Sequence, residues 1–382
     1  MTETVRVACV QPSSGQDMQA NLEAAGALVR EARAAGAELI ALPENVALME
    51  HRTELVQASA APLDAHPAAR YFSALAEETG VWLLAGSMGA DAGDGRVSNR
   101  SVLIDPAGTI VATYDKIHMF DVDLPNGETY RESDAFRPGG QAVVAETPWG
   151  GLGMTVCYDL RFPQLYRALA HAGARLITVP AAFTKHTGEA HWHILMRARA
   201  IESGCFVIAP CMWGSHSGGR KTYGHSLIVD PWGEVLADAG EGVGIVTADL
   251  ELARVDRVRA AIPALAHAGA RLITVPAAFT KHTGEAHWHI LMRARAIEAG
   301  CFVIAPCMWG SHSGDRKTYG HSLIVDPWGE VLADAGEGVG IITADLELAR
   351  VEQVRAAIPA LAHDRDFLLP AGSEQEPRRA TG

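Results

Sequence analysis

The sequence lacks three features that would assign it to particular classes of protein. Its six cysteines include no C-x-x-C pair, so a paired-cysteine zinc or redox motif is absent. No apolar run reaches the roughly 18 residues of a membrane span, and no signal peptide precedes the first apolar run. Basic residues number 32 against 45 acidic ones, and the net charge of −13 argues against a nucleic-acid or membrane-surface partner. We therefore expect a soluble, reduced, cytoplasmic protein with a small-molecule partner.

The apolar residues that are present follow a pattern of alternating strands and helices. With 48% hydrophobic residues in 382, the chain can bury a large core as one domain or two. An apolar run over 5–11 is followed by helical spacing from Asp17, a candidate N-cap, to Gly36, a candidate stop. A second apolar run over 38–42 follows at once. Strand, helix and strand with short connections predict a βαβ unit and an α/β fold.

The following segments predict one more helix and three more strands. Helical spacing returns over 68–79, and 81–87 is an apolar run typical of a buried strand. Residues 100–114 predict a β-hairpin, because the turn-forming segment 105–108, Asp-Pro-Ala-Gly, divides two β-rich runs. The hairpin brings Lys116 to its far end.

Cys157 lies where an apolar strand gives way to a polar, helix-like pattern, within the segment from Gly151 to Arg161. The thiolate is the reactive form of cysteine, and a helix N-terminus helps to stabilise it. The same turn would expose the backbone N–H of Tyr158, which could donate to an oxyanion. The alternative is that Cys157 is a small buried hydrophobe, the commoner role of a single cysteine. Only partners elsewhere in the chain can decide between the two.

Charged residues follow two of the predicted strand regions. Glu44 comes after the second apolar run, and functional groups in open α/β sheets collect at the carboxyl ends of strands. An ordinary loop acid is the alternative for Glu44, as a solvated surface lysine is for Lys116. The connection 121–140 contains Glu128 and Glu132. A loop of this length in a compact domain is often functional, so it could close over a pocket.

Three motifs carry a family resemblance. They are Leu-Pro-Glu44, Asp-Lys116-Ile-His and Val-Cys157-Tyr-Asp-Leu-Arg-Phe-Pro, in this order. Together they resemble the nitrilase superfamily of carbon–nitrogen hydrolases, and the resemblance runs from Val5 to about Arg259. It implies a four-layer α-β-β-α sandwich with a Glu-Lys-Cys triad. It also implies that neither a metal nor another cofactor is needed.

The resemblance assigns a role to each member of the triad. Glu44 would be the general base, Lys116 the electrophile that stabilises the oxyanion, and Cys157 the nucleophile. Superfamily members often carry a further glutamate that positions the substrate, and the segment around Glu132 matches that motif better than Glu128 does. A cysteine thioester intermediate divides the hydrolysis of an unreactive amide into two easier displacements.

Segments 120–125, 190–202 and 223–226 most resemble the superfamily branch that holds deaminated-glutathione amidase and ω-amidase. The expected reaction is hydrolysis of a small carboxylate-bearing amide, similar to deaminated glutathione, to an acid and ammonia. The alternatives are an ω-amidase acting on α-keto acid amides, a hydrolase of N-carbamoyl amines, or, less favoured, an enzyme acting on nitriles. The resemblance also implies a homodimer or a larger homo-oligomer.

Arg161 and the histidines are the remaining candidates for binding. Arg161 could bind a substrate carboxylate through two hydrogen bonds, or it could pair with Asp159 or another acid of the protein. A zinc site would be the alternative use of the histidines, which include positions 186, 191, 193, 216 and 225. Two of them, His191 and His193, are two residues apart on a predicted helix and point to different faces. We therefore expect no metal site.

An almost perfect repeat departs from the family pattern. Residues 168–263 recur as 264–359, an offset of 96. Removing one copy from the 382 residues would leave 286, close to the size of a single domain of this kind. The triad lies outside the repeat, so the chain has one active site at most. The five differences are Ser203/Ala299, Gly219/Asp315, Val246/Ile342, Asp256/Glu352 and Arg257/Gln353.

The repeat leaves three arrangements open. In the first, residues 1–263 form the hydrolase domain, 264–359 an appended half-domain and 360–382 a partly disordered tail. In the second, the fold loops out a 96-residue window, at a closure cost of about 4 kcal/mol. In the third, the extra half pairs with another subunit, as in domain swapping. We favour the first, because the first copy directly follows Cys157. The contrasting functional hypothesis is a scaffold made inactive by the duplication, although the intact triad argues against it.

Overall fold

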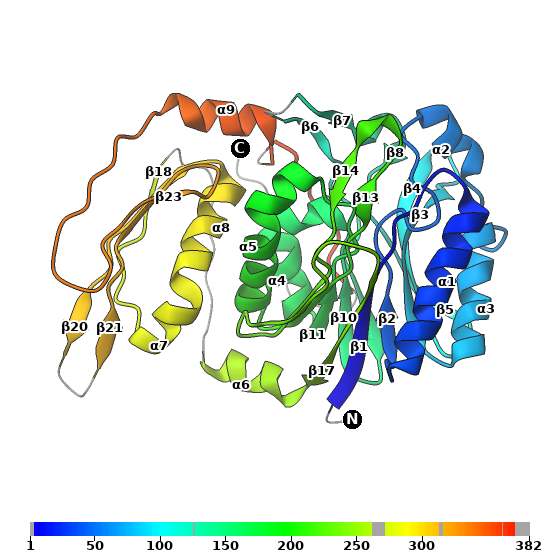
Figure 1. The fold of residues 1–382 in the computed structure, drawn as a ribbon, viewed down its shortest axis with the longest axis horizontal. Helices are drawn as coiled ribbons and strands as arrows, with labels where there is room; N and C mark the ends of the chain where they lie inside the picture. The colour runs from blue at the N-terminus through cyan, green and yellow to red at the C-terminus, as the bar shows by residue number, and fades with distance from the viewer. Residues whose placement is uncertain (1–3, 125–126, 262–271, 313–315, 361, 371–382) are drawn as a thin grey trace.

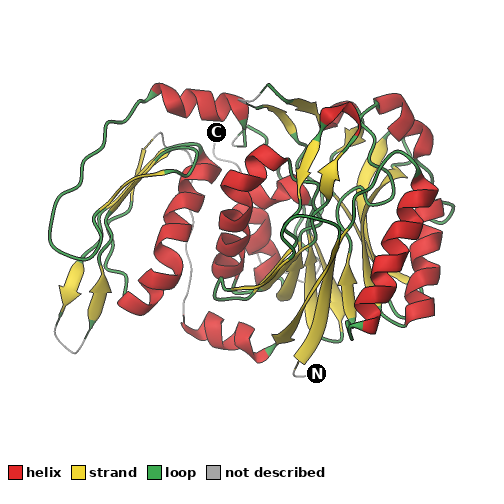
Figure 2. Cartoon of the chain, in the orientation of Figure 1, coloured by secondary structure: helices red, strands yellow, loops and turns green. Residues whose placement is uncertain are grey.

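Layers of helices and sheets follow one another across the molecule (Figure 1). The structure is a computed structural model that describes residues 4–124, 127–261, 272–312, 316–360 and 362–370. Two mixed sheets pack face to face around the main hydrophobic core, which draws residues from both. Helices lie on the outer faces of these sheets, and a third, smaller sheet with its own helix lies beyond them (Figure 2).

The first sheet combines strands of the amino-terminal part with one late strand, β17. β1, β2 and β3 run parallel, whereas β17, β4 and β5 pair antiparallel with their neighbours. The strand order is β17-β1-β2-β3-β4-β5, and β8 pairs with β4. The bounds are β1 Thr4–Gln11, β2 Leu39–Ala41, β3 Trp82–Asp91, β4 Val97–Ile104, β5 Ile110–Asp115, β8 Phe136–Arg137 and β17 Gly244–Glu251.

Helices α1 (Met18–Ala34) and α3 (Pro67–Thr79) cover the outer face of this sheet and form a second core with it. The predicted N-cap of α1 is confirmed, because the Asp17 carboxylate accepts a hydrogen bond from the Ala20 N–H at 3.1 Å. The helix ends just before Gly36, whose φ of +90° suits glycine. A shorter helix, α2 (Thr53–Ser59), follows β2 in the chain.

The second sheet begins with β9 and β10 and is completed by four strands of the first repeat copy. Its order is β16-β15-β12-β11-β10-β9. Helices α4 (Pro163–His171) and α5 (Lys185–Ser203) pack on its outer face, where α5 buries Trp192 and Met196 completely. The bounds are β9 Val143–Thr147, β10 Gly150–Met154, β11 Ala174–Thr178, β12 Phe206–Ala209, β15 Leu227–Val229 and β16 Val235–Asp238.

The expected βαβ unit and hairpin are both present. β1 and β2 are parallel neighbours joined by α1, and β4 and β5 are joined by the turn at 105–108. The connection 121–140 is more structured than expected. It contains the hairpin of β6 (Asp121–Asp123) and β7 (Thr129–Arg131), a 3-10 turn over Glu132–Asp134, and β8.

The second repeat copy forms its own four-stranded sheet in the order β18-β19-β22-β23, backed by α8 (His289–Ala299). Its residues 340–347 form no strand, because β1 is already paired with the equivalent strand β17. The apolar face that this leaves is open: Met308 is 55% exposed, whereas its counterpart Met212 is fully buried. The bounds are β18 Leu272–Thr274, β19 Phe302–Ala305, β22 Leu323–Val325 and β23 Val331–Asp334.

The remaining elements are short or connect the copies. Hairpins β13–β14 and β20–β21 occupy equivalent places in the two copies. Figure 1 shows α6 and α9 at opposite ends of the layers, α9 reaching back toward β6. The bounds are β13 Trp213–Ser215, β14 Lys221–Tyr223, β20 Trp309–Ser311, β21 Lys317–Tyr319, α6 Ala253–Ala261, α7 Lys281–Thr283 and α9 Ala349–Ala357.

After α9 the chain returns to the amino-terminal part of the molecule. Leu368 forms a bridge with Gln141, because its N–H donates to the Gly140 carbonyl at 2.8 Å and its carbonyl accepts from the Ala142 N–H at 2.9 Å. Residues 371–382 of the expected tail lie outside the described residues. Among the described helices, none is both long enough and apolar enough to cross a membrane.

Candidate active site

Cys157 lies just beyond β10 and begins the short 3-10 helix η2 (Cys157–Arg161). We expected the strand to lead directly into a helix. Instead a single 3-10 turn follows the strand, and the α-helix α4 begins only at Pro163. The φ of Cys157 is +49°, a left-handed value that costs a non-glycine residue free energy. Its backbone N–H donates to the Pro180 carbonyl at 2.9 Å, which helps to hold this conformation.

Asp159 anchors the turn from inside the protein. Its fully buried carboxylate accepts hydrogen bonds from the Val156 N–H at 2.9 Å, the Tyr114 hydroxyl at 2.7 Å and the His118 Nδ1 at 2.7 Å. All of these partners lie on the segments next to Cys157 and Lys116. Asp159 is thus engaged in holding the turn and does not pair with Arg161.

Glu44 is buried after the end of β2 and has a partner on each carboxylate oxygen. Oε1 accepts from the Lys116 Nζ at 2.9 Å, and Oε2 accepts from the Ala182 N–H at 3.0 Å. Ala182 belongs to the loop after β11, so the first repeat copy contributes directly to the environment of Glu44. The carboxylate is held in a fixed orientation by groups from both central sheets.

Lys116 and Glu132 form a second buried ion pair beside the first. The Lys116 Nζ lies 2.9 Å from Oε1 and 2.8 Å from Oε2 of Glu132, and only 1% of its side chain is exposed. Glu132 also accepts from the Phe120 N–H at 2.7 Å. Glu132 therefore touches the lysine of the expected triad, whereas Glu128 contacts Tyr130.

Asn99 on β4 links the two carboxylates, a role that the sequence did not reveal. Its Nδ2 donates to Oε1 of Glu44 and to Oε1 of Glu132, both at 3.0 Å. No motif marks Asn99, because its importance depends on β4 lying beside both acids in the folded chain. Two neighbouring carboxylates repel each other when both are ionised. The hydrogen bonds from Asn99 and the positive charge of Lys116 offset this repulsion.

The electrostatics of the site favour an ionised Glu44 beside a protonated thiol. Burial raises the pKa of Glu44, but the charge of Lys116 and a hydrogen bond with Cys157 outweigh it and lower the pKa below its usual value. Burial and the charge of Glu44 raise the pKa of Cys157 well above its usual value, against the effect of Lys116. For Lys116, burial lowers the pKa, but Glu132 and Glu44 outweigh it and raise it. The resting pair is a carboxylate and a thiol.

Cys157, Glu44, Lys116 and Glu132 all line one cavity of about 590 Å³. Arg220, from the loop between β13 and β14, lines the same cavity. Its guanidinium lies 5.2 Å from the centroid of the Tyr130 ring. Its Nη2 donates to the Ala182 carbonyl at 2.5 Å, and its Nε has no hydrogen-bond partner among the described residues. Sequence analysis missed this cation because no motif surrounds it.

Tyr158 and Arg161 differ in how they relate to this cavity. The backbone N–H of Tyr158, next to the thiol, has no hydrogen-bond partner among the described residues. Arg161 is the last residue of η2 and is buried, and its Nη2 donates to the His191 Nδ1 at 3.1 Å. Burial lowers the pKa of Arg161 to about 10. Arg161 pairs with no carboxylate of the described residues and is not part of the cavity wall.

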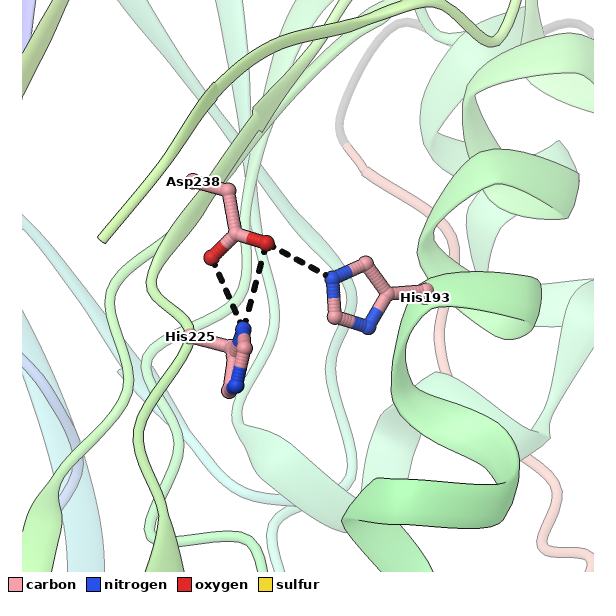
Figure 3. A group of neighbouring side chains, drawn as sticks. All are labelled: His193, His225 and Asp238. Carbon is pink, nitrogen blue, oxygen red and sulfur yellow. Dashed lines mark hydrogen bonds and ion pairs between the residues drawn. The ribbon is translucent and has the colours of Figure 1, made fainter. Parts of the chain in front are cut away.

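His193, His225 and Asp238 bring three potential metal ligands together (Figure 3). Their donor atoms all lie within 4.8 Å of one another. The Asp238 carboxylate accepts from the His193 Nε2 and the His225 Nδ1, both at 2.9 Å, which orients the two imidazoles. The group is not part of the wall of the cavity that holds Cys157, and it recurs in the second copy as His289, His321 and Asp334.

Comparison with known proteins identifies the family. The profile of the carbon–nitrogen hydrolases matches residues 6–260 and, separately, residues 261–356. The chain belongs to the carbon–nitrogen hydrolase family. This hydrolase is 42% identical over 264 residues to the deaminated glutathione amidase of Synechocystis sp. (strain PCC 6803 / GT-S), a match that covers 68% of the chain and 96% of the relative.

Solved structures resemble about two thirds of this hydrolase. The Caenorhabditis elegans NitFhit protein is 34% identical with a TM-score of 0.61, and the match covers 68% of this chain and 64% of that one. A variant of the amidase from Nesterenkonia sp. AN1 is 28% identical with a TM-score of 0.57, over 67% of this chain and 97% of that one. Its structure shows acrylamide added to the active-site cysteine.

The pKa shifts of this hydrolase predict a broad, level pH profile. Glu44 has a lowered pKa and stays ionised as pH falls toward the usual carboxyl range, while Lys116 has a raised pKa and stays protonated as pH rises. We expect kcat/KM for amide hydrolysis to be nearly constant between about pH 6 and pH 9. Initial rates in a series of buffers of equal ionic strength would measure it. An acid limb near pH 7 would mean that Glu44 titrates there, contrary to this electrostatic description.

Proposed function

We propose that this chain hydrolyses a carboxylate-bearing amide of the deaminated-glutathione type through a thioester on Cys157. The observation that carries the proposal is the meeting of Cys157, Glu44 and Lys116 on the wall of a single cavity. Support for the substrate comes from relatives about 40% identical over two thirds of the chain, which are named deaminated glutathione amidases. The intact site argues against the alternative of an inactive scaffold.

In the proposed mechanism Glu44 moves the protons. Its carboxylate removes the proton of the Cys157 thiol as sulfur attacks the amide carbon, and the same proton passes to the departing amine. A water molecule, deprotonated by Glu44, then attacks the thioester and releases the acid and the thiol. The raised pKa of Cys157 beside an ionised Glu44 supports this order, since the thiol needs a base before it can react.

The oxyanion of each tetrahedral intermediate would be stabilised by Lys116 and by the backbone N–H of Tyr158. The N–H has no other acceptor among the described residues, and the ammonium is already next to the thiol's base. Each such donor contributes about 3 kcal/mol to transition-state stabilisation. Glu132, which binds the ammonium with both oxygens, would hold Lys116 in position as well as limit where substrate can lie.

Recognition of the substrate carboxylate falls to a cation of the cavity wall. Arg220 is half-buried in that wall and its Nε has no partner among the described residues, so it can donate to a carboxylate. Arg161, the residue expected from the sequence, also has two unpartnered nitrogens, Nε and Nη1, but lies outside the described wall. We therefore assign the first contact to Arg220 and keep Arg161 as a second candidate.

We further infer that residues 1–263 form a four-layer α-β-β-α sandwich of the nitrilase type. The duplicate 264–359 would be an appended half-domain, and 360–382 a tail. The pairing of β17 with β1 supports this division, as does the position of β11 beside β10. A cytoplasmic location, a small-molecule substrate without nucleic-acid or membrane partners, and a homodimer or larger homo-oligomer remain predictions.

The substrate proposal is tested by comparing three classes of compound with the full-length protein. Glutathione is γ-glutamyl-cysteinyl-glycine, so cleavage of its deaminated form at the γ-amide releases cysteinylglycine, whereas ammonia leaves only from a primary amide. We expect kcat/KM for deaminated glutathione to exceed that for an α-keto acid amide by at least about tenfold, equivalent to roughly 1.4 kcal/mol of transition-state binding. Mass spectrometry of the dipeptide product and an ammonia assay would follow the two reactions.

The products also separate the alternatives. Faster ammonia release from the α-keto acid amide would identify an ω-amidase, and joint release of carbon dioxide and ammonia from an N-carbamoyl amine would identify a carbamoyl hydrolase. Absence of turnover on all three, in protein that is folded by circular dichroism, would support the scaffold hypothesis instead.

A further inference from the structure

The two repeat copies pack against each other through the same face of the same helix. In α5, Trp192 and Met196 pack on the second sheet, and their counterparts in α8 pack on the third sheet. The face of α8 that remains buries Ile290, Ala294 and Ile297 in the main core, in contact with α5. Of the equivalent residues of α5, Ala198 and Ile201 belong to that core, and Ile194 is partly buried against it. Helix α8 is thus buried on both sides.

The ion pairs across this contact are reciprocal. Arg199 of the first copy pairs with Glu298 of the second, and Arg295 of the second pairs with Glu202 of the first. Arg295 and Glu298 are the counterparts of Arg199 and Glu202 at the offset of 96 residues. All four side chains are buried or nearly so, at most 23% exposed.

Histidine and tryptophan residues at the edge of the contact between α5 and α8 also form reciprocal contacts between the two copies. The His191 Nε2 donates to the carbonyl of Trp328 at 3.1 Å, and the His287 Nε2 donates to the carbonyl of Trp232 at 2.9 Å. The ring centroids of both pairs are 4.4 Å apart, with interplanar angles of 59° and 58°. Again each residue of one copy makes the contact that its counterpart makes in the other.

An interface in which residue i contacts j and j contacts i is isologous, the geometry by which two identical subunits meet about a two-fold axis. We propose that residues 264–359 occupy the surface of the first copy that would otherwise receive a second chain. The duplicate thus acts as an internal substitute for a partner subunit. The partner that fits the face of α5 is a second copy of the same half-domain.

This contact also reaches the turn that carries the nucleophile. The Arg199 Nε donates to the Leu160 carbonyl at 2.9 Å, and Leu160 lies in η2 with Cys157. Glu298 of the duplicate is therefore one hydrogen-bonded residue away from that turn. Arg199 and Glu298 are positioning residues in this proposal, since neither lines the cavity.

The first test reverses one charge of the interface in the full chain. Glu298→Arg places a cation against Arg199, so the duplicate should undock and leave α5 free to pair with α5 of another chain. We expect the assembly mass, measured by native mass spectrometry and light scattering, to double relative to the unmodified protein. Glu330→Arg, on the same copy but exposed, is the matched control and should leave the mass unchanged. An unchanged mass for a folded Glu298→Arg protein would overturn the proposal.

A second pair of variants keeps the proposal testable if Glu298→Arg does not fold. Deleting residues 264–359, or instead 168–263, leaves 286 residues in each case, and the two products differ at only five positions. Both should again show twice the number of chains of the full-length protein. In the 264–359 deletion, Glu202→Arg should abolish the added association, and mixing that protein with its Arg199→Glu equivalent should restore it. Single-copy proteins that associate no more than the full chain would contradict the internal-subunit assignment.

Discussion

Replacing Cys157 with alanine is expected to lower kcat/KM for amide hydrolysis by at least about 10⁴-fold, because no other group can form the thioester. The described cavity wall contains no second cysteine. Cys157 already borders a cavity, so the loss of its sulfur should leave the turn folded. Hydrolysis of deaminated glutathione, followed through the dipeptide product, is the measurement.

Cys307→Ala is the control for this experiment. Cys307 is half-buried in the second copy and belongs to no part of the catalytic cavity, so its variant should retain full activity. An acyl adduct of one substrate fragment per chain, trapped by acid quenching and mapped to Cys157, would add direct support. Turnover that survives in Cys157→Ala would exclude Cys157 as the nucleophile.

Replacing Glu44 with glutamine should change hydrolysis and thiol reactivity in opposite directions. Loss of the general base is expected to lower kcat by about 10² to 10⁴-fold. The negative charge of Glu44 and its hydrogen bond to Cys157 both raise the pKa of the thiol, whereas Lys116 lowers it. Without the carboxylate the pKa of Cys157 should fall, and alkylation by iodoacetamide should become faster at neutral pH.

The two readouts separate a catalytic role from damage to the fold. A misfolded site would expose all the cysteines alike, whereas the expected result is faster labelling of Cys157 alone, with the other thiols as slow as before. Glu128→Gln, which removes a different carboxylate from the same cavity wall, is the matched control and should alter both rates less than about threefold. Slower alkylation of Cys157 in Glu44→Gln would contradict the assigned electrostatics.

Local sequence patterns predicted the elements that carry the site, because these elements depend on neighbours in the chain. The N-cap at Asp17, the parallel pair β1 and β2, and the turn after β4 all follow from residues a few positions apart. The apolar run before Cys157 likewise predicted β10. These features rest on capping, periodicity and turn chemistry, which a short window of sequence contains.

Contacts between distant segments were beyond such reasoning. The family resemblance grouped Glu44, Lys116 and Cys157, but Asn99 and Arg220 carry no motif and became visible only when their loops and strands were placed beside the cavity. The left-handed φ of Cys157 is likewise supported from outside the turn, by the hydrogen bond of its N–H to the Pro180 carbonyl. The failure of residues 340–347 to form a strand reflects competition, since β1 can pair with one copy only.

The sheet of the second copy is uncovered because the chain has too few amino-terminal sheets to cover both copies. Each chain supplies one amino-terminal sheet but two repeat copies whose sheets could pack on it. An assembly of any size therefore contains twice as many repeat-copy sheets as amino-terminal sheets to cover them. Exchange of segments between chains can change which copy is covered, but it cannot change the number left bare. Exchange of segments alone therefore cannot place an amino-terminal sheet over the open face at Met308 in every chain. A fragment that ends before residue 168 would supply an amino-terminal sheet without adding another repeat copy that needs one.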